Sequence, residues 1–523
     1  MRHVMRYLGA PAASTNSSVI WVAIVLIAAC FHATGAAWPF DVLHVRGEPL
    51  WWIQIVAQAV LIAALHRCRS RRAAVATGLL FATTWLCATF WWLFISMHTY
   101  GDLAWPLAAL AVGALAAALG LYYGLAAGVY WHLRDRPAWA RVAAFAALWT
   151  AAEMARGTWL TGFGWGAIGY AHADGPLAGA IPWMGVYGVG AVAAAIAAAL
   201  APASGTGATR LVAVAVLAFG WAGTAWNTGA TESVGTVSVT LLQGNIPQDE
   251  KFQPGSGVPM ALQWYSDLLL QARTDIVVAP ETAIPVLPQE LPDGYWDTLR
   301  QRFSQGAQAA VIGMPLGSFS QGYTNSVVAL VPGQPEPQRY DKHHLVPFGE
   351  FIPPLFKWFT RMMNIPLGDF NRGALGQPSI TWHHQRLAPN ICYEDLFGEE
   401  LATRFSQPDS APTIFVNVSN IGWFGDSIAI DQHLQISRMR ALEFERPMVR
   451  ATNTGATAVI DHRGRVTHRL ARVTRGVLVA TVEGRQGLTA YARWSARWGL
   501  WPLWIAASAI VLVAARARST RAP

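Results

Sequence analysis

The sequence contains little charge and little cysteine. Only 13% of its 523 residues are Asp, Glu, Lys or Arg, whereas 53% are hydrophobic. About a quarter of the residues in an ordinary soluble domain are charged, so the chain as a whole is not a typical soluble enzyme. Of its four cysteines, Cys30, Cys68 and Cys87 lie in or beside apolar segments, and only Cys392 lies in a long polar region. That region therefore has neither a disulfide framework nor a cysteine-rich metal site.

The charged residues are unevenly distributed along the chain. Residues 1 to 230 are nearly all apolar, while residues 233–490 have the composition of a globular domain, with ample length for one hydrophobic core. The net charge of +8 does not require a nucleic-acid partner, because many arginines stand in short clusters between apolar runs, as in membrane proteins. We expect a membrane-embedded protein that binds no nucleic acid.

Eight apolar runs reach or approach the length of about 20 residues that a helix needs to cross a bilayer. They lie near residues 18–37, 49–65, 73–97, 104–132, 138–155, 177–202, 209–228 and 497–515. The first run is too long for a simple signal peptide and lacks a clear cleavage site. We therefore predict membrane segments at residues 1–232 and 489–523, with a globular domain at 233–488 inserted between the seventh and eighth helices.

Basic clusters flank alternate ends of these runs, which predicts the orientation of the chain. They comprise Arg2 and Arg6; Arg67, Arg69, Arg71 and Arg72; Arg134, Arg136 and Arg141; Arg210; and Arg516, Arg518 and Arg521. Basic loops remain on the cytoplasmic side. We expect a multi-pass protein of the bacterial inner membrane, with both termini in the cytoplasm and residues 233–488 in the periplasm.

One loop on the outward side, Arg156 to Gly166, is rich in glycine and aromatic residues. It fits an aromatic belt at the membrane interface, where Trp and Tyr rings gather. The alternative is a re-entrant wall at which a lipid headgroup docks, with Arg156 near its phosphate.

Short β-rich runs alternate with helical patterns in the globular region, which predicts a layered α/β fold. The expected strands are 237–242, 275–279, 309–313, 326–331, 391–393, 413–418, 456–461 and 477–482, and the expected helices are 258–273, 293–305 and 429–445.

Three residues in this region stand at or just beyond the ends of apolar runs. Glu281 follows a buried strand, a position suited to general-base chemistry, although a Glu that caps a helix or forms an ion pair in the next turn fits it equally well. Lys342 precedes an apolar loop and can stabilise an oxyanion or a thiolate. Cys392 by itself fits a small buried core residue better than a nucleophile. Adjacent His343 and His344 would point to opposite faces of a strand, and no metal-binding motif accompanies them, so we expect no metal and no cofactor.

Glu281, Lys342 and Cys392 occur in the order of the Glu–Lys–Cys triad of the nitrilase, or carbon–nitrogen hydrolase, superfamily, which the sequence resembles over about residues 235–485. The sequence motifs that carry this resemblance are Pro280-Glu281-Thr282-Ala283, residues 342–350 (KHHLVPFGE) and Asn390-Ile391-Cys392-Tyr393-Glu394. With eight membrane spans around this domain, the chain is similar to the membrane-bound apolipoprotein N-acyltransferases of that superfamily. The resemblance implies an αββα sandwich between membrane helices 7 and 8.

The resemblance also implies a reaction in two steps. Glu281 would take the proton of Cys392, whose thiolate would attack the sn-1 ester of a phospholipid, expected to be phosphatidylethanolamine. Lys342 would hold the oxyanion. The α-amine of the S-diacylglyceryl cysteine of an apolipoprotein would then attack the thioester. Glu350, Tyr393 and Glu394 match supporting positions of the family, although packing explains Tyr393 and Glu394 equally well. We expect a monomer.

Apolar side chains that suit lipid access surround this site. Residues 348–367 would form an interfacial lid that includes Phe351, Trp358 and Phe359, and a second loop carries Trp423 and Phe424. A core helix is the alternative for the first segment. Phe252 stands where some family members have Trp, so a role that needs an indole N–H is in doubt.

Two other functions fit parts of the sequence. A membrane-tethered amidase, in which water releases a small acyl group from Cys392, would use the same triad but would not need the apolar segment 348–367. A transporter with an outward domain would carry charges inside its spans, and these spans carry few.

Overall fold

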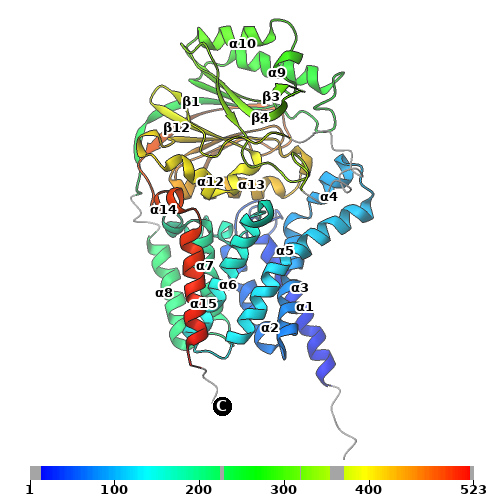
Figure 1. Cartoon of the computed structure of the whole chain (residues 1–523), viewed down its shortest axis with the longest axis vertical. Coiled ribbons are helices and arrows are strands. Elements are labelled where there is room, and N and C mark those ends of the chain that lie inside the picture. Colours follow the sequence, from blue (N-terminus) through cyan, green and yellow to red (C-terminus); the bar gives the residue numbers. More distant parts are fainter. Residues whose placement is uncertain (1–12, 224–228, 319, 354–369, 519–523) are drawn as a thin grey trace, which may run out of the picture.

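The computed structural model describes residues 13–223, 229–318, 320–353 and 370–518. Apolar helices form a bundle, and a globular half lies on one end of it (Figure 1). The helices are α1 (Ala13–Thr34), α2 (Trp51–Arg67), α3 (Arg71–Phe90), α5 (Trp105–Leu133), α6 (Ala138–Thr158), α7 (Ile181–Leu200), α8 (Gly207–Gly223) and α15 (Trp501–Arg516). Each of these helices coincides with one of the apolar runs in the sequence.

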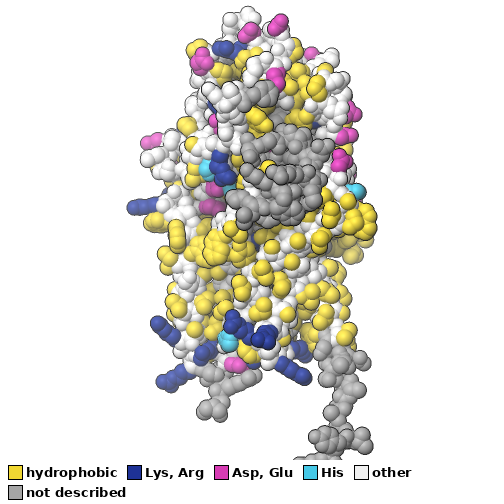
Figure 2. Space-filling model, turned by 45° about the vertical axis from the view of Figure 1, so that its right-hand side comes forward, with side chains coloured by type: hydrophobic (Ala, Val, Ile, Leu, Met, Phe, Trp, Pro, Cys, Tyr) yellow, Lys and Arg dark blue, Asp and Glu magenta, His cyan; other side chains and the backbone are white. Residues whose placement is uncertain are grey.

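Three described stretches are both long and apolar enough to cross a membrane, namely α3, α5 and residues 178–200. The pair α14 (Ala490–Trp498) and α15, bent by 90° at its break, would make a fourth. Hydrophobic side chains cover the bundle, and Lys and Arg side chains gather at the end away from the globular half (Figure 2). This distribution of hydrophobic and basic side chains is typical of proteins that span a bilayer.

The helix in the third apolar run ends earlier than the sequence suggests. Helix α3 stops at Phe90, and α4 (Leu93–Ile95) with the π-helical turn η1 (Ser96–Tyr100) follows before α5 begins. This segment lies beside the globular half rather than within the bundle (Figure 1). It forms an arm that joins the two halves of the molecule.

Two six-stranded sheets build the globular half. The first has the order β12-β1-β2-β3-β4-β5, with β1 Glu232–Gln243, β2 Ile276–Ala279, β3 Ala309–Ser318, β4 Gly322–Leu330, β5 Gln338–Asp341 and β12 Gly476–Gln486. The second has the order β11-β10-β9-β8-β7-β6, with β6 Ile380–Trp382, β7 Gln385–Ile391, β8 Ile414–Ser419, β9 Met448–Thr452, β10 Ala458–Ile460 and β11 Val466–Arg469. In each sheet three central strands are parallel, so their carboxyl ends share one edge.

The layers are the expected αββα sandwich. One apolar cluster, with Val278 and Val416 among its members, fills the space between the sheets. Helices α9 (Gly257–Gln271) and α10 (Tyr295–Ser304) cover the outer face of the first sheet. Helices α12 (Gly398–Ala402) and α13 (Ala429–Phe444) cover the second sheet and share a continuous core with the bundle. The layer of α12 and α13 therefore shares one core with the apolar helices, whereas the space between the sheets and the outer face of the first sheet have clusters of their own.

Candidate active site

Cys392 begins a sharp turn at the carboxyl end of β7. The strand ends at Ile391, and residues Cys392–Leu396 form a 3-10 turn, so the expectation that the strand continues to Tyr393 was wrong. The backbone of Cys392 is left-handed, with φ of 53°. Strained residues of this kind persist only where their surroundings hold them, and they gather at functional sites.

Glu281 and Lys342 lie together beside this turn. Glu281 follows β2, and its Oε1 accepts hydrogen bonds from Lys342 Nζ at 3.4 Å and from Asn325 Nδ2 at 2.7 Å. Its Oε2 accepts from the backbone N–H of Asn420 at 2.8 Å. The side chain is nearly buried, so these donors provide the compensation that a buried carboxylate requires.

Glu350 completes the group around Lys342. Lys342 Nζ lies 2.9 Å from Glu350 Oε1, closer than to Glu281, and Asn325 Nδ2 donates to the same oxygen at 2.8 Å. Val346 N donates to Glu350 Oε2 at 2.8 Å. Burial alone would lower the pKa of Lys342, but the two carboxylates raise it above its ordinary value. Lys342 is therefore a cation held in place from two sides.

The thiol of Cys392 resists ionisation in the resting site. Burial raises its pKa to about 12, and the charge of Glu281 acts in the same direction. Lys342 and a hydrogen bond with Ser419 lower the pKa, but not enough to offset burial. The thiolate must therefore form when a base removes the proton beside a cation.

Glu394 holds the turn against the loop that carries Lys342. Its carboxylate accepts hydrogen bonds from Tyr340 Oη at 2.8 Å, from the backbone N–H groups of His343 and His344 at 2.7 and 3.1 Å, and from Ile391 N at 2.7 Å. One buried side chain thus fixes both the Lys342 segment and the residue before Cys392. Its contacts suit positioning, whereas packing alone would not need them.

A buried polar network lies behind Cys392, and the sequence analysis did not predict it. His433 Nε2 lies 3.2 Å from the carbonyl oxygen of Cys392 and 2.9 Å from Asp395 Oδ1, and Arg450 contacts both His433 Nδ1 and Asp395. Arginine only donates, so Nδ1 accepts and the ring proton is on Nε2. His433 therefore donates toward the strained turn.

Asn325, Asn420, His433 and Arg450 are the site residues that sequence reasoning missed. Asn325 lies in β4, His433 in α13 and Arg450 in β9, far along the chain from the groups that they contact. The available signal was Arg450, a charged residue inside an otherwise apolar strand, which needs partners when buried. Among the described residues, no group of three or more His, Cys, Asp or Glu side chains is arranged to hold a metal ion.

Comparisons with known proteins agree with this architecture. Residues 42–200 match the family model described as apolipoprotein N-acyltransferase N-terminal domain, and residues 239–491 match the carbon-nitrogen hydrolase model. An apolipoprotein N-acyltransferase of Verminephrobacter eiseniae is 55% identical over 91% of this chain and 92% of its own length, and one of Ralstonia nicotianae is 44% identical over 98% of both. The chain belongs to the apolipoprotein N-acyltransferase family. The resemblance inferred from the sequence is confirmed.

In this family member, the loop after α6 directly contacts the turn that begins at Cys392. Tyr393 Oη donates to the carbonyl oxygen of Gly162 at 3.0 Å, and His344 Nε2 lies 2.9 Å from the carbonyl oxygen of Thr161. Tyr393 therefore connects the turn that begins at Cys392 to the apolar half. Its contacts include a specific hydrogen bond in addition to packing.

Arg156 supports this loop from inside. The side chain is 1% exposed and donates to the carbonyl oxygens of Phe163 and Trp165 at 2.6 and 2.8 Å, and to Tyr123 Oη at 3.0 Å. The interpretation that placed Arg156 near a lipid phosphate was wrong, because its guanidinium is committed to the protein interior.

The aromatic residues proposed for lipid access lie in different surroundings. Phe424 contacts Trp92 with ring centroids 4.3 Å apart, and Trp423 lies edge-on to Tyr100 at 5.9 Å. The loop that carries them therefore meets the arm formed by α4 and η1.

The expected lid is only partly described. Phe351 lies near Arg372, with 5.7 Å between the guanidinium carbon and the ring centroid. Phe252 is half-buried beside Lys251. Trp358 and Phe359 lie outside the described residues.

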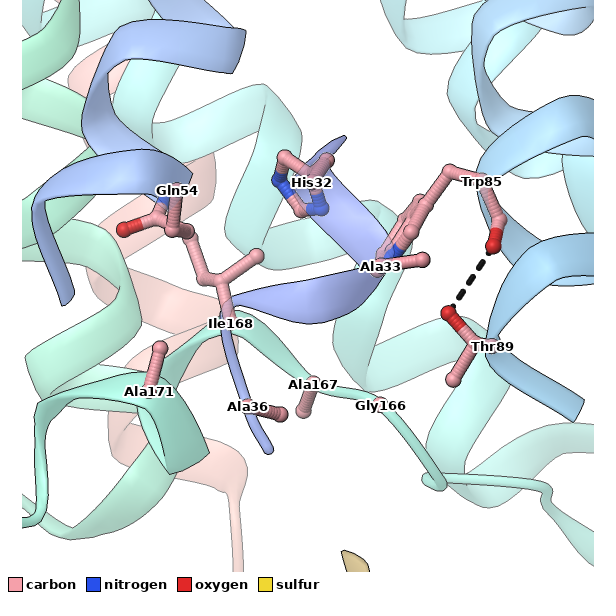
Figure 3. A pocket seen from close by; sticks show the side chains of 10 residues that line it. All are labelled: His32, Ala33, Ala36, Gln54, Trp85, Thr89, Gly166, Ala167, Ile168 and Ala171. Carbon is pink, nitrogen blue, oxygen red and sulfur yellow. Dashed lines mark hydrogen bonds between the residues drawn. The ribbon is translucent and has the colours of Figure 1, made fainter. Parts of the chain in front are cut away.

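A cavity in the helix bundle lies beside the loop that follows α6. His32, Gln54 and Trp85 line it from three helices, and Gly166 and Ile168 lie along its edge (Figure 3). The cavity shares no lining residue with the Glu281, Lys342 and Cys392 group.

Proposed function

We propose that this chain transfers a fatty acyl chain from the sn-1 position of a membrane phospholipid to the α-amine of the N-terminal S-diacylglyceryl cysteine of apolipoproteins. The observation that carries the proposal is the position of the Glu281, Lys342 and Glu350 group, beside Cys392 in a domain whose core continues into apolar helices. Phosphatidylethanolamine is the proposed donor, and the enzyme acts as a monomer.

In the first step, Glu281 accepts the thiol proton of Cys392, and the thiolate attacks the ester carbonyl. Lys342 and the backbone N–H of Tyr393 stabilise the negative charge on the carbonyl oxygen. The bond to the glycerol oxygen breaks, and Glu281 returns the proton to that oxygen. A lysophospholipid leaves and a thioester remains on Cys392.

In the second step, the neutral α-amine of the diacylglyceryl cysteine attacks the thioester. Glu281 accepts a proton from the attacking nitrogen, the carbon–sulfur bond breaks, and the proton passes to the leaving thiolate. An amide forms and Cys392 is restored. A covalent intermediate between two substrates predicts ping-pong kinetics.

The apolar helices support a catalytic site at the bilayer surface. Both substrates are held in the membrane by acyl chains, so the thiol must lie near the interface. We propose eight membrane helices around a domain at residues 233–488 that faces the periplasm, with both termini in the cytoplasm. The basic end of the bundle supports this orientation (Figure 2).

Intact-protein mass spectrometry of the full chain tests the proposal. After incubation with phospholipid, the protein should gain the mass of one acyl chain, labile to hydroxylamine, and Cys392→Ala should not. Cys87→Ala, which removes a thiol from helix α3, is the matched control and should acylate normally. A diacylglyceryl-cysteine peptide should then discharge the adduct onto its amine. Discharge by water alone at the same rate would contradict acyl transfer.

A further inference from the structure

His433 and Asn417 donate hydrogen bonds to the same backbone oxygen, and the mechanism above uses neither residue. The carbonyl oxygen of Cys392 lies 3.2 Å from His433 Nε2 and 3.4 Å from Asn417 Nδ2. Both side chains are buried. His433 comes from α13 and Asn417 from β8, so donors from two separate elements converge on one peptide group.

The surroundings of His433 fix it as a hydrogen-bond donor. Arg450 Nη2 lies 3.2 Å from His433 Nδ1 and can only donate, so the ring proton is on Nε2. That N–H is shared between the Cys392 carbonyl and Asp395 Oδ1, which is 2.9 Å away. Ser437 and Arg450 donate to the other oxygen of Asp395. The network therefore holds the imidazole in one tautomer and one orientation.

The orientation of this peptide group matters because of what lies on its other side. A trans peptide is planar, and its N–H points away from its C=O. The C=O of Cys392 faces His433 in the helix layer on the outer side of the second sheet. Glu281 and Lys342 follow β2 and β5 of the first sheet. The N–H of Tyr393 is therefore directed toward the side on which Lys342 lies.

The backbone of the turn does not hold this orientation by its own preference. Cys392 has φ of 53°, in the left-handed region that residues other than glycine rarely adopt. Tyr393 is the second residue of the 3-10 turn, where N–H groups have no partner within the turn. Without partners for the carbonyl, the peptide would be free to rotate and to carry this N–H out of the site. Hydrogen bonds to the carbonyl oppose that rotation.

We propose that His433 and Asn417 are positioning residues that act through the Cys392–Tyr393 peptide and aim the Tyr393 N–H at the oxyanion. The use of that N–H as an oxyanion donor rests on the proposed function. A donor stabilises a tetrahedral oxyanion best when it is already directed at the position where the charge develops. Both residues should therefore affect attack of the thiolate on a carbonyl group, and not reactions that form no oxyanion.

Two reactions of Cys392 separate these cases in the full chain, with Cys30, Cys68 and Cys87 replaced by alanine. Cys392 is partly exposed. Acylation by p-nitrophenyl acetate passes through an oxyanion, whereas alkylation by iodoacetamide displaces iodide and forms none. Intact mass gives the rate constant of each reaction, and the quantity compared between variants is the ratio of acylation to alkylation.

His433→Leu should lower this ratio about tenfold, less than the hundredfold to thousandfold loss that follows removal of an oxyanion donor itself. His433→Gln keeps an N–H donor and should restore most of the ratio. Asn417→Leu should lower the ratio by a smaller factor, because its contact with the carbonyl is the longer. Ser437→Ala is the matched control: it removes a hydrogen bond of the same network but leaves both donors to the carbonyl, so its ratio should equal that of the wild type.

The comparison uses variants that unfold cooperatively above the assay temperature, and Asn417→Leu decides the outcome if His433→Leu does not fold. A wild-type ratio in either leucine variant would overturn the proposal. An equal loss of the ratio in Ser437→Ala and His433→Leu would also overturn it, because disturbance of the network alone would then explain the effect. No phospholipid is present, so failure here is distinct from failure of the acyl-enzyme experiment with phospholipid, which alone decides the proposed function.

Discussion

Replacing Glu350 by glutamine would remove one of the two carboxylates that hold the charge on Lys342. The Glu350 contact is the shorter, at 2.9 Å against 3.4 Å for Glu281, and the Lys342 side chain is 1% exposed. Glutamine keeps the shape of Glu350 and can still accept one hydrogen bond, but it has no charge and only one acceptor oxygen. Val346 N or Lys342 would lose its acceptor.

The size of the effect follows from this contact. A hydrogen bond between charged groups contributes about 1.5–3 kcal/mol, which corresponds to about one to two pKa units. Without Glu350, burial acts against a single carboxylate, so the pKa of Lys342 falls by about that amount. The protonated amine stabilises the oxyanion and is lost as pH rises through its pKa. The alkaline limb of acylation should therefore move down by about one to two units in Glu350→Gln.

The assay is the initial rate of thioester formation on Cys392, followed by quenched intact mass from pH 6 up to the highest pH at which the protein stays folded, because the pKa of Lys342 lies well above its ordinary value. Glu400→Gln is the matched control, because Glu400 lies in the same region and contacts His344 at 2.9 Å, while the contacts of Lys342 are with Glu281 and Glu350. The control should keep the wild-type alkaline limb. Identical limbs in all three proteins would refute the assignment of Glu350 as the main support of the Lys342 charge.

Three further substitutions test the positioning contacts. Glu394→Gln would turn an amide N–H₂ toward backbone donors. The acylation rate should therefore fall about tenfold to a hundredfold, which corresponds to a loss of about 1.5–3 kcal/mol. An unchanged rate would contradict the positioning role of Glu394. Tyr393→Phe removes the hydrogen bond to Gly162, so thermal unfolding should show a loss of about 1 kcal/mol; an unaltered melting temperature would dismiss the contact. Burial tends to raise the pKa of Asp395, but its partners, including Arg450, hold it below the ordinary value. Arg450→Met should therefore destabilise the protein by about 3–5 kcal/mol at pH 7, and unfolding scans should show the difference shrinking below about pH 4 as Asp395 takes up a proton. A difference independent of pH would contradict that reasoning.

The sequence predicted the parts of the fold that depend on apolar patterning. Strands such as β2 and β8 are continuous buried runs, and the expected positions coincide with them. Strand β11 was missed because most of its residues are exposed and polar. Strand β9 was missed because Arg450 interrupts an apolar run, although its partners compensate the charge inside the protein.

The site was predictable where chemistry and chain order coincide, and not where it depends on contacts across the fold. Glu281, Lys342 and Cys392 stand at or just beyond strand ends, which a sequence pattern can show. Asn325 joins Glu281 and Glu350 only because β4 places its side chain between them, and an asparagine in a strand carries no sign of such a role. The alternative that placed Arg156 near a lipid phosphate failed for a related reason, since its partners are two backbone carbonyls of the folded loop and the hydroxyl of Tyr123.

The hydrogen bonds between the two halves connect the geometry of the Cys392 turn to the apolar helices. The turn that begins at Cys392 is held from the membrane side by Tyr393 on Gly162 and from behind by His433 on helix α13, whose core is shared with the bundle. A soluble amidase needs neither contact to bind a small amide. In this chain, a shift of the loop after α6 would move Tyr393 and with it the strained residue beside it. The site is therefore built so that the position of the thiol depends on the membrane-facing half, as expected where both substrates arrive through the bilayer.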